Sequence, residues 1–282
     1  MGSDMRIGFR AVNGLQIRFA ESDSSSSRCL VLTSPWPESL LAFERVWARL
    51  SAAARLVAVD LPGFGRSERR PELLSPAAMS EFLIRLLDDW GIEHPHLVSP
   101  GVGTAAALFA AANHPGRLQS LVVGSGGCAF PLKVSGMLKD LIQAPSMDVS
   151  GSPDPRRLVQ DAMTAMGPAA PAADVVGDYV ESNMAGRLAD AARYVRSYPG
   201  QLRLLAGLLS QVFTPVQVVS GRRDPLVPLA NAEYLHARLP NSRLDVLDTG
   251  HFTWEEEPGQ YAAIIAAWVT GGYLTGTGLR DP

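Results

Sequence analysis

The sequence contains little that would point to a disulfide-stabilised, membrane-spanning or nucleic-acid-binding protein. Its two cysteines, Cys29 and Cys128, are too few for a disulfide framework, and Cys29 is expected to be a small buried residue. No apolar run approaches the roughly 20 residues that a membrane helix needs. The formal net charge of -3 provides no basic excess for binding a nucleic acid or an anionic membrane surface.

Targeting features are also missing from the N-terminus. "MGSDMRIGFRAVNG" has no continuous apolar stretch of the kind found in secretory signals, and Arg6 stands where a myristoylation signal has Ser or Thr. We therefore expect a cytoplasmic protein. The composition, 46% apolar and 19% charged in 282 residues, is that of a globular chain with a substantial core.

Short apolar runs alternate with helical stretches along most of the chain. "RCLVLT" (28–33) and "RLVAVD" (55–60) are continuous apolar runs, typical of strands buried on both faces. Between such runs, Ser75-Pro76 provides the cap and first-turn proline of a helix that ends at Gly91. The alternation predicts an α/β fold with a mostly parallel sheet of about eight strands.

The alternation stops after Ser125. Residues 126–209 contain helical stretches and proline-rich breaks such as "SGSPDP" and "GPAAPAA", without a convincing buried strand. Strands resume at "TPVQVVSG". We predict a core domain in two parts, residues 1–128 and 211–282, with a helical cap at residues 129–210 inserted between them.

The stretch "HLVSPGVGTAAALFAAANHP" (96–115) has the pattern of a nucleophile elbow, small-x-nucleophile-x-small between a strand and a helix. Counting back from Gly103, the nucleophile position is Gly101, which has no side chain to attack a substrate. Ser99 is a poor substitute, because the next residue, Pro100, has no N–H to donate. We expect Ser99 to be the small residue that permits tight packing.

A carboxylate and a histidine follow two later strands: "GRRDPLVP" contains Asp224 and "TGHFTWEE" contains His251. Ligands of parallel sheets bind beyond the carboxyl ends of the strands, so we expect the two to meet there, about 2.6–3.2 Å apart. A buried Asp224 would hold one nitrogen of His251 while the other accepts a proton. Ser34 and Ser125 also lie at strand ends, but neither has an elbow around it.

Together these segments resemble the α/β-hydrolase family, in which nucleophile, acid and histidine occur in this order. "DLPGFGRSE" is similar to the D-x-x-G-x-G-x-S loop of its epoxide hydrolase and haloalkane dehalogenase branch, and "GRRDPLVP" and "GHFTWEEEP" are similar to its acid and histidine segments. The resemblance extends over nearly the whole chain. It implies an α/β-hydrolase fold with a helical cap.

Two positions depart from the family pattern. The family's His-Gly-x-Pro appears here as Ser34-Pro35-Trp36-Pro37, followed by Glu38-Ser39. The resemblance implies an oxyanion hole made by the backbone N–H groups of Trp36 and Val102, and both residues retain an N–H. The second departure is Gly101, since this position is Asp in epoxide hydrolases and dehalogenases and Ser in esterases and lipases.

A small-molecule pocket is expected between cap and sheet. We expect its lining to include Trp36, Val102, Phe252 or Trp254 from the core and Met137, Leu141 or Tyr194 from the cap. Cap tyrosines of epoxide hydrolases polarise the epoxide oxygen, which makes Tyr194 and Tyr198 candidates. No metal or cofactor is expected, because the other histidines lack metal-ligand spacing. The sequence leaves a homodimer open.

Three functions fit these observations. The first is a hydrolase of the epoxide hydrolase or dehalogenase type in which Gly101 has replaced the nucleophile, as an inactivated or engineered variant. The second is a non-hydrolytic enzyme (a lyase, cyclase, isomerase or cofactor-free oxygenase) in which His251 and Asp224 abstract a proton. The third is a binding protein, against which the presence of both residues argues.

Overall fold

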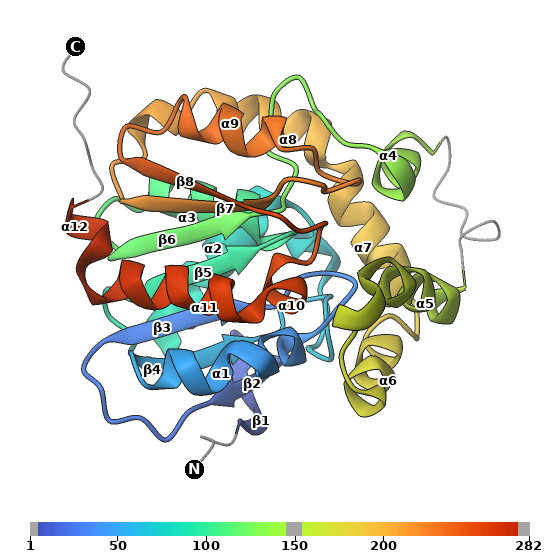
Figure 1. The fold of residues 1–282 in the computed structure, drawn as a ribbon, viewed down its shortest axis with the longest axis horizontal. Coiled ribbons are helices and arrows are strands. Elements are labelled where there is room, and N and C mark those ends of the chain that lie inside the picture. Colours follow the sequence, from blue (N-terminus) through green and yellow to red (C-terminus); the bar gives the residue numbers. More distant parts are fainter. Residues whose placement is uncertain (1–4, 145–153, 276–282) are drawn as a thin grey trace.

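An eight-stranded sheet forms the centre of the computed structural model, which describes residues 5–144 and 154–275. The strands are β1 (Arg6–Val12), β2 (Leu15–Glu21), β3 (Cys29–Thr33), β4 (Arg55–Val59), β5 (His96–Pro100), β6 (Ser120–Gly124), β7 (Val216–Gly221) and β8 (Ser242–Leu247). Their order is β1-β2-β4-β3-β5-β6-β7-β8 (Figure 1). The β1–β2 and β2–β4 pairs are antiparallel and the others parallel. The predicted mostly parallel sheet is confirmed.

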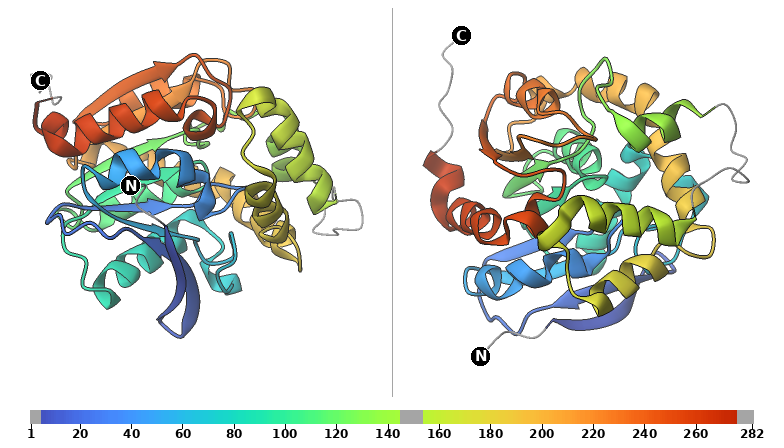
Figure 2. Two further views of the ribbon diagram at one scale, coloured as in Figure 1. Left: turned by 60° about the horizontal axis from the view of Figure 1, so that its bottom comes forward. Right: turned by 45° about the vertical axis from the view of Figure 1, so that its right-hand side comes forward.

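The central strands β3, β5 and β6 are buried throughout because helices cover both faces of the sheet (Figures 1 and 2). Successive side chains of a strand point to opposite faces, so Leu97 and Val123 join one core and Val98 and Val122 the other. The first core is covered by α2 (Pro76–Asp89), α3 (Gly103–Asn113) and α9 (Ala230–His236), and the second by α1 (Glu44–Ser51) and α11 (Pro258–Ala267).

Helix α3 begins directly after the turn that contains Gly101, the expected nucleophile position. Every residue from Gly103 to Ala111 is buried, and five of these nine are alanine. Alanine favours the helix and adds little bulk, so α3 packs closely against the sheet while α2 and α8 (Tyr198–Ala206) cover it. The start of α3 is thereby fixed beside the carboxyl end of β5.

The segment expected to form a cap is helical where the structure describes it. Between β6 and β7 lie α4 (Gly136–Gln143), α5 (Pro155–Met166), α6 (Ala173–Glu181), α7 (Arg187–Arg196) and α8. Most of these inserted helices lie beyond the carboxyl ends of the parallel strands (Figures 1 and 2). Residues 145–153 of the expected cap lie outside the described residues.

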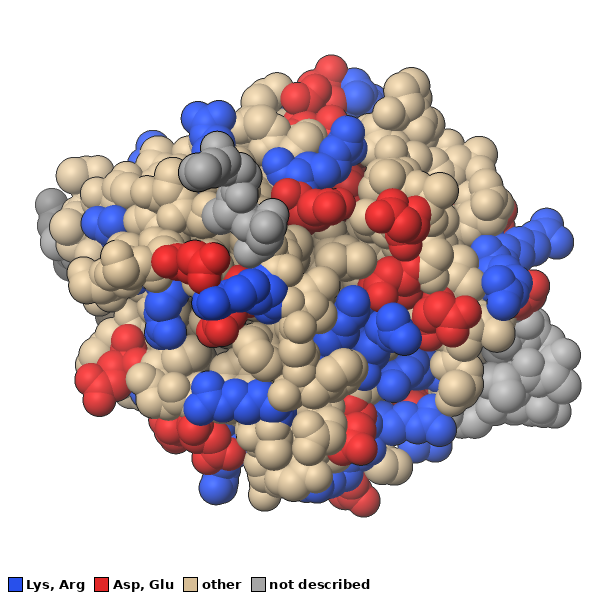
Figure 3. Space-filling model, turned by 90° about the horizontal axis from the view of Figure 1, so that it is seen from below, with Lys and Arg blue, Asp and Glu red and all other residues tan. Residues whose placement is uncertain are grey.

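Charged side chains of both signs lie next to one another over the face shown in Figure 3. The ion pairs of the protein surface include Arg117 with Asp88 at 2.8 Å and Arg6 with Asp23 at 2.8 Å. Exposed pairs of this kind contribute only about 0–1 kcal/mol each, so they do not decide the fold. Within residues 5–144 and 154–275, no helix is long and apolar enough to span a bilayer.

Gly103 is a position in the β5–α3 turn that has no room for a side chain. A Cβ there would lie 2.3 Å from Ser99 Oγ and 2.6 Å from Thr33 Oγ1, two buried atoms that hydrogen-bond to each other. Gly103→Ala is therefore expected to destabilise the protein by about 1–3 kcal/mol. Gly177→Ala, in the open interior of α6, is the control and should stabilise by about 0.5–1 kcal/mol. Urea unfolding measures both, and equal effects would contradict this account of the turn.

Candidate active site

Gly101 lies at the apex of the tight turn between β5 and α3. Its N–H donates to the Gly124 carbonyl at 2.9 Å, and its own carbonyl accepts from the Thr104 N–H at 3.2 Å. Its φ of +58° lies in the left-handed region that glycine adopts without strain. A Cβ at this position would meet Pro35 Cβ at 3.5 Å, an ordinary contact. The turn therefore has space for a side chain at residue 101, at the cost of a strained backbone.

Ser99, two residues before the apex, has a side chain that is buried and hydrogen-bonded inside the core. Its hydroxyl shares a 2.6 Å hydrogen bond with that of Thr33 on β3, and it is fully buried. Its carbonyl accepts from the Thr104 hydroxyl at 3.0 Å. Ser99 is not among the residues that line the cavity described below. These contacts agree with a structural part for Ser99.

Asp224 and His251 hydrogen-bond to each other where β7 and β8 end. Asp224 Oδ2 lies 2.8 Å from His251 Nδ1, and Asp224 Oδ1 accepts the N–H groups of Leu226 and Val227, both at 2.8 Å. The Asp224 side chain is fully buried and that of His251 is 9% exposed. An ionised carboxylate can only accept, so Nδ1 donates and Nε2 keeps a lone pair. His251 therefore has a nitrogen available to take a proton.

The histidine segment is fixed by a second carboxylate. Glu256, on α10 (Thr253–Glu256), accepts the Gly250 N–H at 2.7 Å and the Phe252 N–H at 3.1 Å, so it holds both neighbours of His251. The rings of Phe252 and Trp254 lie edge-on to the imidazole, at centroid distances of 5.0 and 6.4 Å. These contacts restrict the orientation of the histidine.

Two residues that line the cavity, Trp36 and Val102, have backbone N–H groups without partners among the described residues. Within residues 5–144 and 154–275, neither the Trp36 amide nor the Val102 amide donates to another residue. Both residues line the same cavity as Gly101 and His251. Unpaired amides on either side of a reacting centre are the donors that an oxyanion requires.

The cavity has a volume of about 680 Å³, within the range of small-molecule sites. Its walls are formed by the loops after the strands and by α4, α5, α7 and α8. Apolar side chains dominate them, chiefly Trp36, Val102, Met137, Leu138, Leu158, Met166, Val195 and Phe252. Among the described residues, no cluster of three or more potential ligands could hold a metal. The cavity thus suits a mostly apolar organic molecule.

The expected site residues divide into two groups. Trp36, Gly101, Val102, Tyr198, His251 and Phe252 line the cavity, as do Met137 and Ser125, and Asp224 lies behind His251. Tyr194 and Trp254 do not line it, and their polar atoms have partners elsewhere. The Tyr194 hydroxyl donates to the Val102 carbonyl at 3.0 Å, and the Trp254 indole donates to Glu38 Oε1 at 2.8 Å. Leu141 also lies outside the lining.

Two residues that line the cavity, Tyr198 and Ser125, have hydroxyls without a hydrogen-bond partner among the described residues. Tyr198 is 2% exposed, and among the described residues its hydroxyl has no hydrogen-bond partner. Ser125 follows β6 with a φ of +48°, and its buried hydroxyl is likewise unpaired in the described part of the chain. Ser34, also unpaired there, is buried away from the lining.

Two buried carboxyl groups near the site could not be identified from the sequence. Glu38 and Glu255 are 0% and 1% exposed, and the Tyr179 hydroxyl of α6 donates to Glu255 Oε1 at 2.6 Å. Burial, together with the negative charge of Glu255, raises the pKa of Glu38 well above its ordinary value. Burial raises the pKa of Glu255 to about 7, although the Tyr179 hydroxyl and Arg45 oppose the shift. The sequence gives no sign of this burial, because glutamate side chains are ordinarily exposed both in loops, such as that of Glu38, and in short helices, such as the one that contains Glu255.

The raised pKa of Glu255 predicts a pH-dependent stability. The folded protein keeps the proton up to about pH 7, while the unfolded chain releases it near 4.5. The free energy of unfolding should therefore fall as pH rises through this window. Urea unfolding at several pH values measures the slope, which Glu255→Gln should flatten.

Glu72→Gln is the matched control, because this exposed glutamate is in solvent in both states. A Glu255→Gln variant with the same slope as the starting protein would show that the buried carboxyl does not hold the proton.

Comparison with known proteins places these features in a family. Residues 30–264 match the sequence model of the Alpha/beta hydrolase family. A relative from Burkholderia vietnamiensis, 2-hydroxy-6-oxononadienedioate/2-hydroxy-6-oxononatrienedioate hydrolase, is 28% identical over 263 residues, covering 86% of this chain and 88% of the relative.

Two solved structures share the fold at lower sequence identity. Epoxide Hydrolase A from Mycobacterium thermoresistibile superposes with a TM-score of 0.77 at 18% identity, covering 98% of this chain and 100% of that one. The haloalkane dehalogenase DatA from Agrobacterium tumefaciens C58 superposes with a TM-score of 0.78 at 18% identity, covering 94% and 96%. At such identities, the likeness extends to the fold alone.

Proposed function

The chain belongs to the alpha/beta hydrolase family, and from that premise we propose that it is an enzyme of the epoxide hydrolase or haloalkane dehalogenase type. Its substrate is a small to medium-sized, mostly apolar molecule. The nucleophile position holds Gly101, so this form does not make a covalent intermediate there.

The observation that carries the proposal is the geometry around Gly101. The residue occupies a left-handed turn in which an added Cβ would make only an ordinary contact, 3.5 Å from Pro35 Cβ. The unpaired amides of Trp36 and Val102 and the His251–Asp224 pair belong to the same site. Each of these groups serves a nucleophilic displacement, and a receptor would need none of them.

The chemistry follows from these positions once a carboxylate stands at residue 101. Its oxygen attacks the electrophilic carbon, and the C–O bond of an epoxide or the carbon–halogen bond breaks. The Tyr198 hydroxyl supplies the proton to an epoxide oxygen. His251 Nε2 then takes a proton from water, and the hydroxide attacks the ester carbonyl while the Trp36 and Val102 amides stabilise its oxyanion. The tetrahedral intermediate collapses with cleavage of the ester C–O bond, and its hydroxyl proton passes to the product alkoxide, which regenerates the carboxylate at residue 101. The protonated His251 returns its proton to the Tyr198 phenolate, or to water after a dehalogenation. With Gly101, the first step has no nucleophile.

A second function is favoured by the presence of the hydrogen-bonded His251–Asp224 pair in a chain that has glycine at the nucleophile position. His251 can take a proton from a carbon acid bound in the cavity, and the two amides can stabilise the resulting enolate. A lyase, cyclase, isomerase or cofactor-free oxygenase would use this chemistry. In that case, a side chain at residue 101 would occupy space that the substrate needs.

Gly101→Asp distinguishes the two functions. We expect it to raise turnover of an epoxide or haloalkane by about a thousandfold or more, since the nucleophile contributes several orders of magnitude in such sites. The left-handed turn should cost the variant about 1 kcal/mol of stability. Gly101→Ser, assayed on p-nitrophenyl esters beside it, shows which nucleophile the site accepts. Steady-state kinetics and thermal unfolding provide the measurements.

His251→Ala is the control in both backgrounds. It should abolish the gain produced by Gly101→Asp, because the intermediate would no longer be hydrolysed. An intrinsic activity that Gly101→Asp blocks and His251→Ala removes would favour the non-hydrolytic function. An intrinsic activity lost in Ser125→Ala would show that Ser125 acts as the nucleophile, contrary to the proposal.

A further inference from the structure

The loop of residues 36–40, which carries the Trp36 amide, is attached to the inserted helices by a buried asparagine. Asn183 lies two residues beyond the end of α6 and is 1% exposed. Its Oδ1 accepts the Trp36 indole N–H at 2.8 Å, and its Nδ2 donates to the carbonyls of Pro37 at 2.5 Å and Tyr179 at 2.8 Å. One side chain thus connects α6 to both Trp36 and Pro37.

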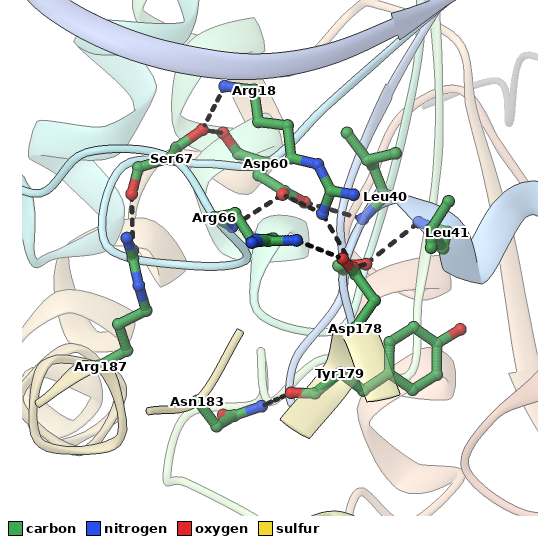
Figure 4. A network of polar contacts seen from close by, with 11 residues as sticks. Arg18, Leu40, Leu41, Asp60, Arg66, Ser67, Asp178, Tyr179, Asn183 and Arg187 are labelled. Carbon is green, nitrogen blue, oxygen red and sulfur yellow. Dashed lines mark hydrogen bonds and ion pairs between the residues drawn. The ribbon is translucent and has the colours of Figure 1, made fainter. Parts of the chain in front are cut away.

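The far end of the loop is held by a network of charges (Figure 4). Asp178 of α6 accepts the Ser39 hydroxyl at 2.5 Å and pairs with the buried Arg18 at 2.8 Å. Asp60 accepts the Leu40 N–H at 2.7 Å. The loop therefore contacts α6 at both ends, and Asn183 holds the end that faces the cavity.

We propose that Asn183 is a positioning residue that sets the direction of the Trp36 backbone N–H, so that the oxyanion site is complete only while α6 is seated on the loop. This inference rests on the proposed function, in which that amide stabilises an oxyanion. Asn183 itself is not a lining residue of the cavity, and it acts through Trp36.

The physical reason is that an amide stabilises a developing charge only if it already points at it. A donor that must reorient during the reaction loses much of its effect. Asn183 fixes Trp36 by its indole and the next residue by its carbonyl, which leaves the intervening backbone little freedom. An apolar residue at position 183 would leave the indole N–H and two carbonyls buried without partners.

Binding of an anion compared with a neutral molecule of the same shape tests the inference in the Gly101 protein. The probes are 4-nitrophenolate and nitrobenzene, titrated into the starting protein, Asn183→Leu, Trp36→Phe and the double variant. Asn183→Leu should weaken phenolate binding about tenfold, or about 1.4 kcal/mol, and change nitrobenzene binding by less than about twofold. In the Trp36→Phe background, which already lacks the indole N–H, it should have a smaller effect, because of its contacts with the loop only that with the Pro37 carbonyl remains to be lost.

Arg66→Ala is the control for seating of α6. It removes a half-exposed partner of Asp178, at 3.3 Å, and leaves every polar contact of residues 36–40 in place, so the preference for phenolate should stay the same. Equal weakening of both probes by Asn183→Leu would overturn the inference, as would an undiminished effect in the Trp36→Phe background. If Asn183→Leu does not fold, Trp36→Phe alone must show the selective loss of phenolate binding.

A second readout keeps the inference separate from the proposed function. If the starting protein shows no preference for phenolate, the oxyanion site fails, and backbone relaxation of ¹⁵N-labelled protein decides the inference alone. The order parameter of the Trp36 amide should drop from about 0.85 to below about 0.6 in Asn183→Leu, or in Trp36→Phe, while that of Val102 is maintained. An unchanged Trp36 amide would overturn the inference.

Discussion

The close approach of the β5–α3 turn to the end of β6 is the constraint on which the site depends. Gly101 donates to the Gly124 carbonyl, and its own carbonyl lies so near β6 that a Cβ on Gly126 would come within 2.4 Å of it. Gly103 is equally crowded by Ser99. The apex cannot shift without breaking these contacts, so residue 101 has a fixed position whether or not it carries a side chain. The amides and His251 are arranged around that position.

The inserted helices are part of this arrangement, in addition to closing the cavity. The Tyr194 hydroxyl of α7 binds the Val102 carbonyl, and Asn183 after α6 binds the Trp36 indole. Both residues of the candidate oxyanion site are therefore held from the same side by the inserted segment. Tyr194 is absent from the lining, while Tyr198, one turn further along, lines the cavity and its hydroxyl has no partner within residues 5–144 and 154–275. The two tyrosines thus differ in that the hydroxyl of Tyr194 donates a hydrogen bond to the Val102 carbonyl, whereas that of Tyr198 remains available to a bound molecule.

The sheet, the turn at Gly101 and the meeting of Asp224 with His251 could be predicted because each depends on local pattern and chain order. Apolar runs mark buried strands, and residues directly after parallel strands share one edge. The direction in which the Tyr194 side chain points could not be predicted, because the orientation of an inserted helix is set by tertiary packing. Asn183 gave no signal, since its partner Trp36 is 147 residues away in the sequence. Glu38 and Glu255 were missed because burial of a carboxyl is decided by the surrounding fold.

Both proposed reactions require that His251 present an unprotonated Nε2 to the cavity, with Asp224 holding the proton on Nδ1. Long-range ¹H–¹⁵N correlation NMR of the neutral imidazole tests it directly, since the two tautomers give different nitrogen shifts. The account predicts the Nδ1–H tautomer for His251 in the protein as it stands, and its loss in Asp224→Ala. A neutral His251 that carries its proton on Nε2, or exchanges freely between both nitrogens, would contradict the account.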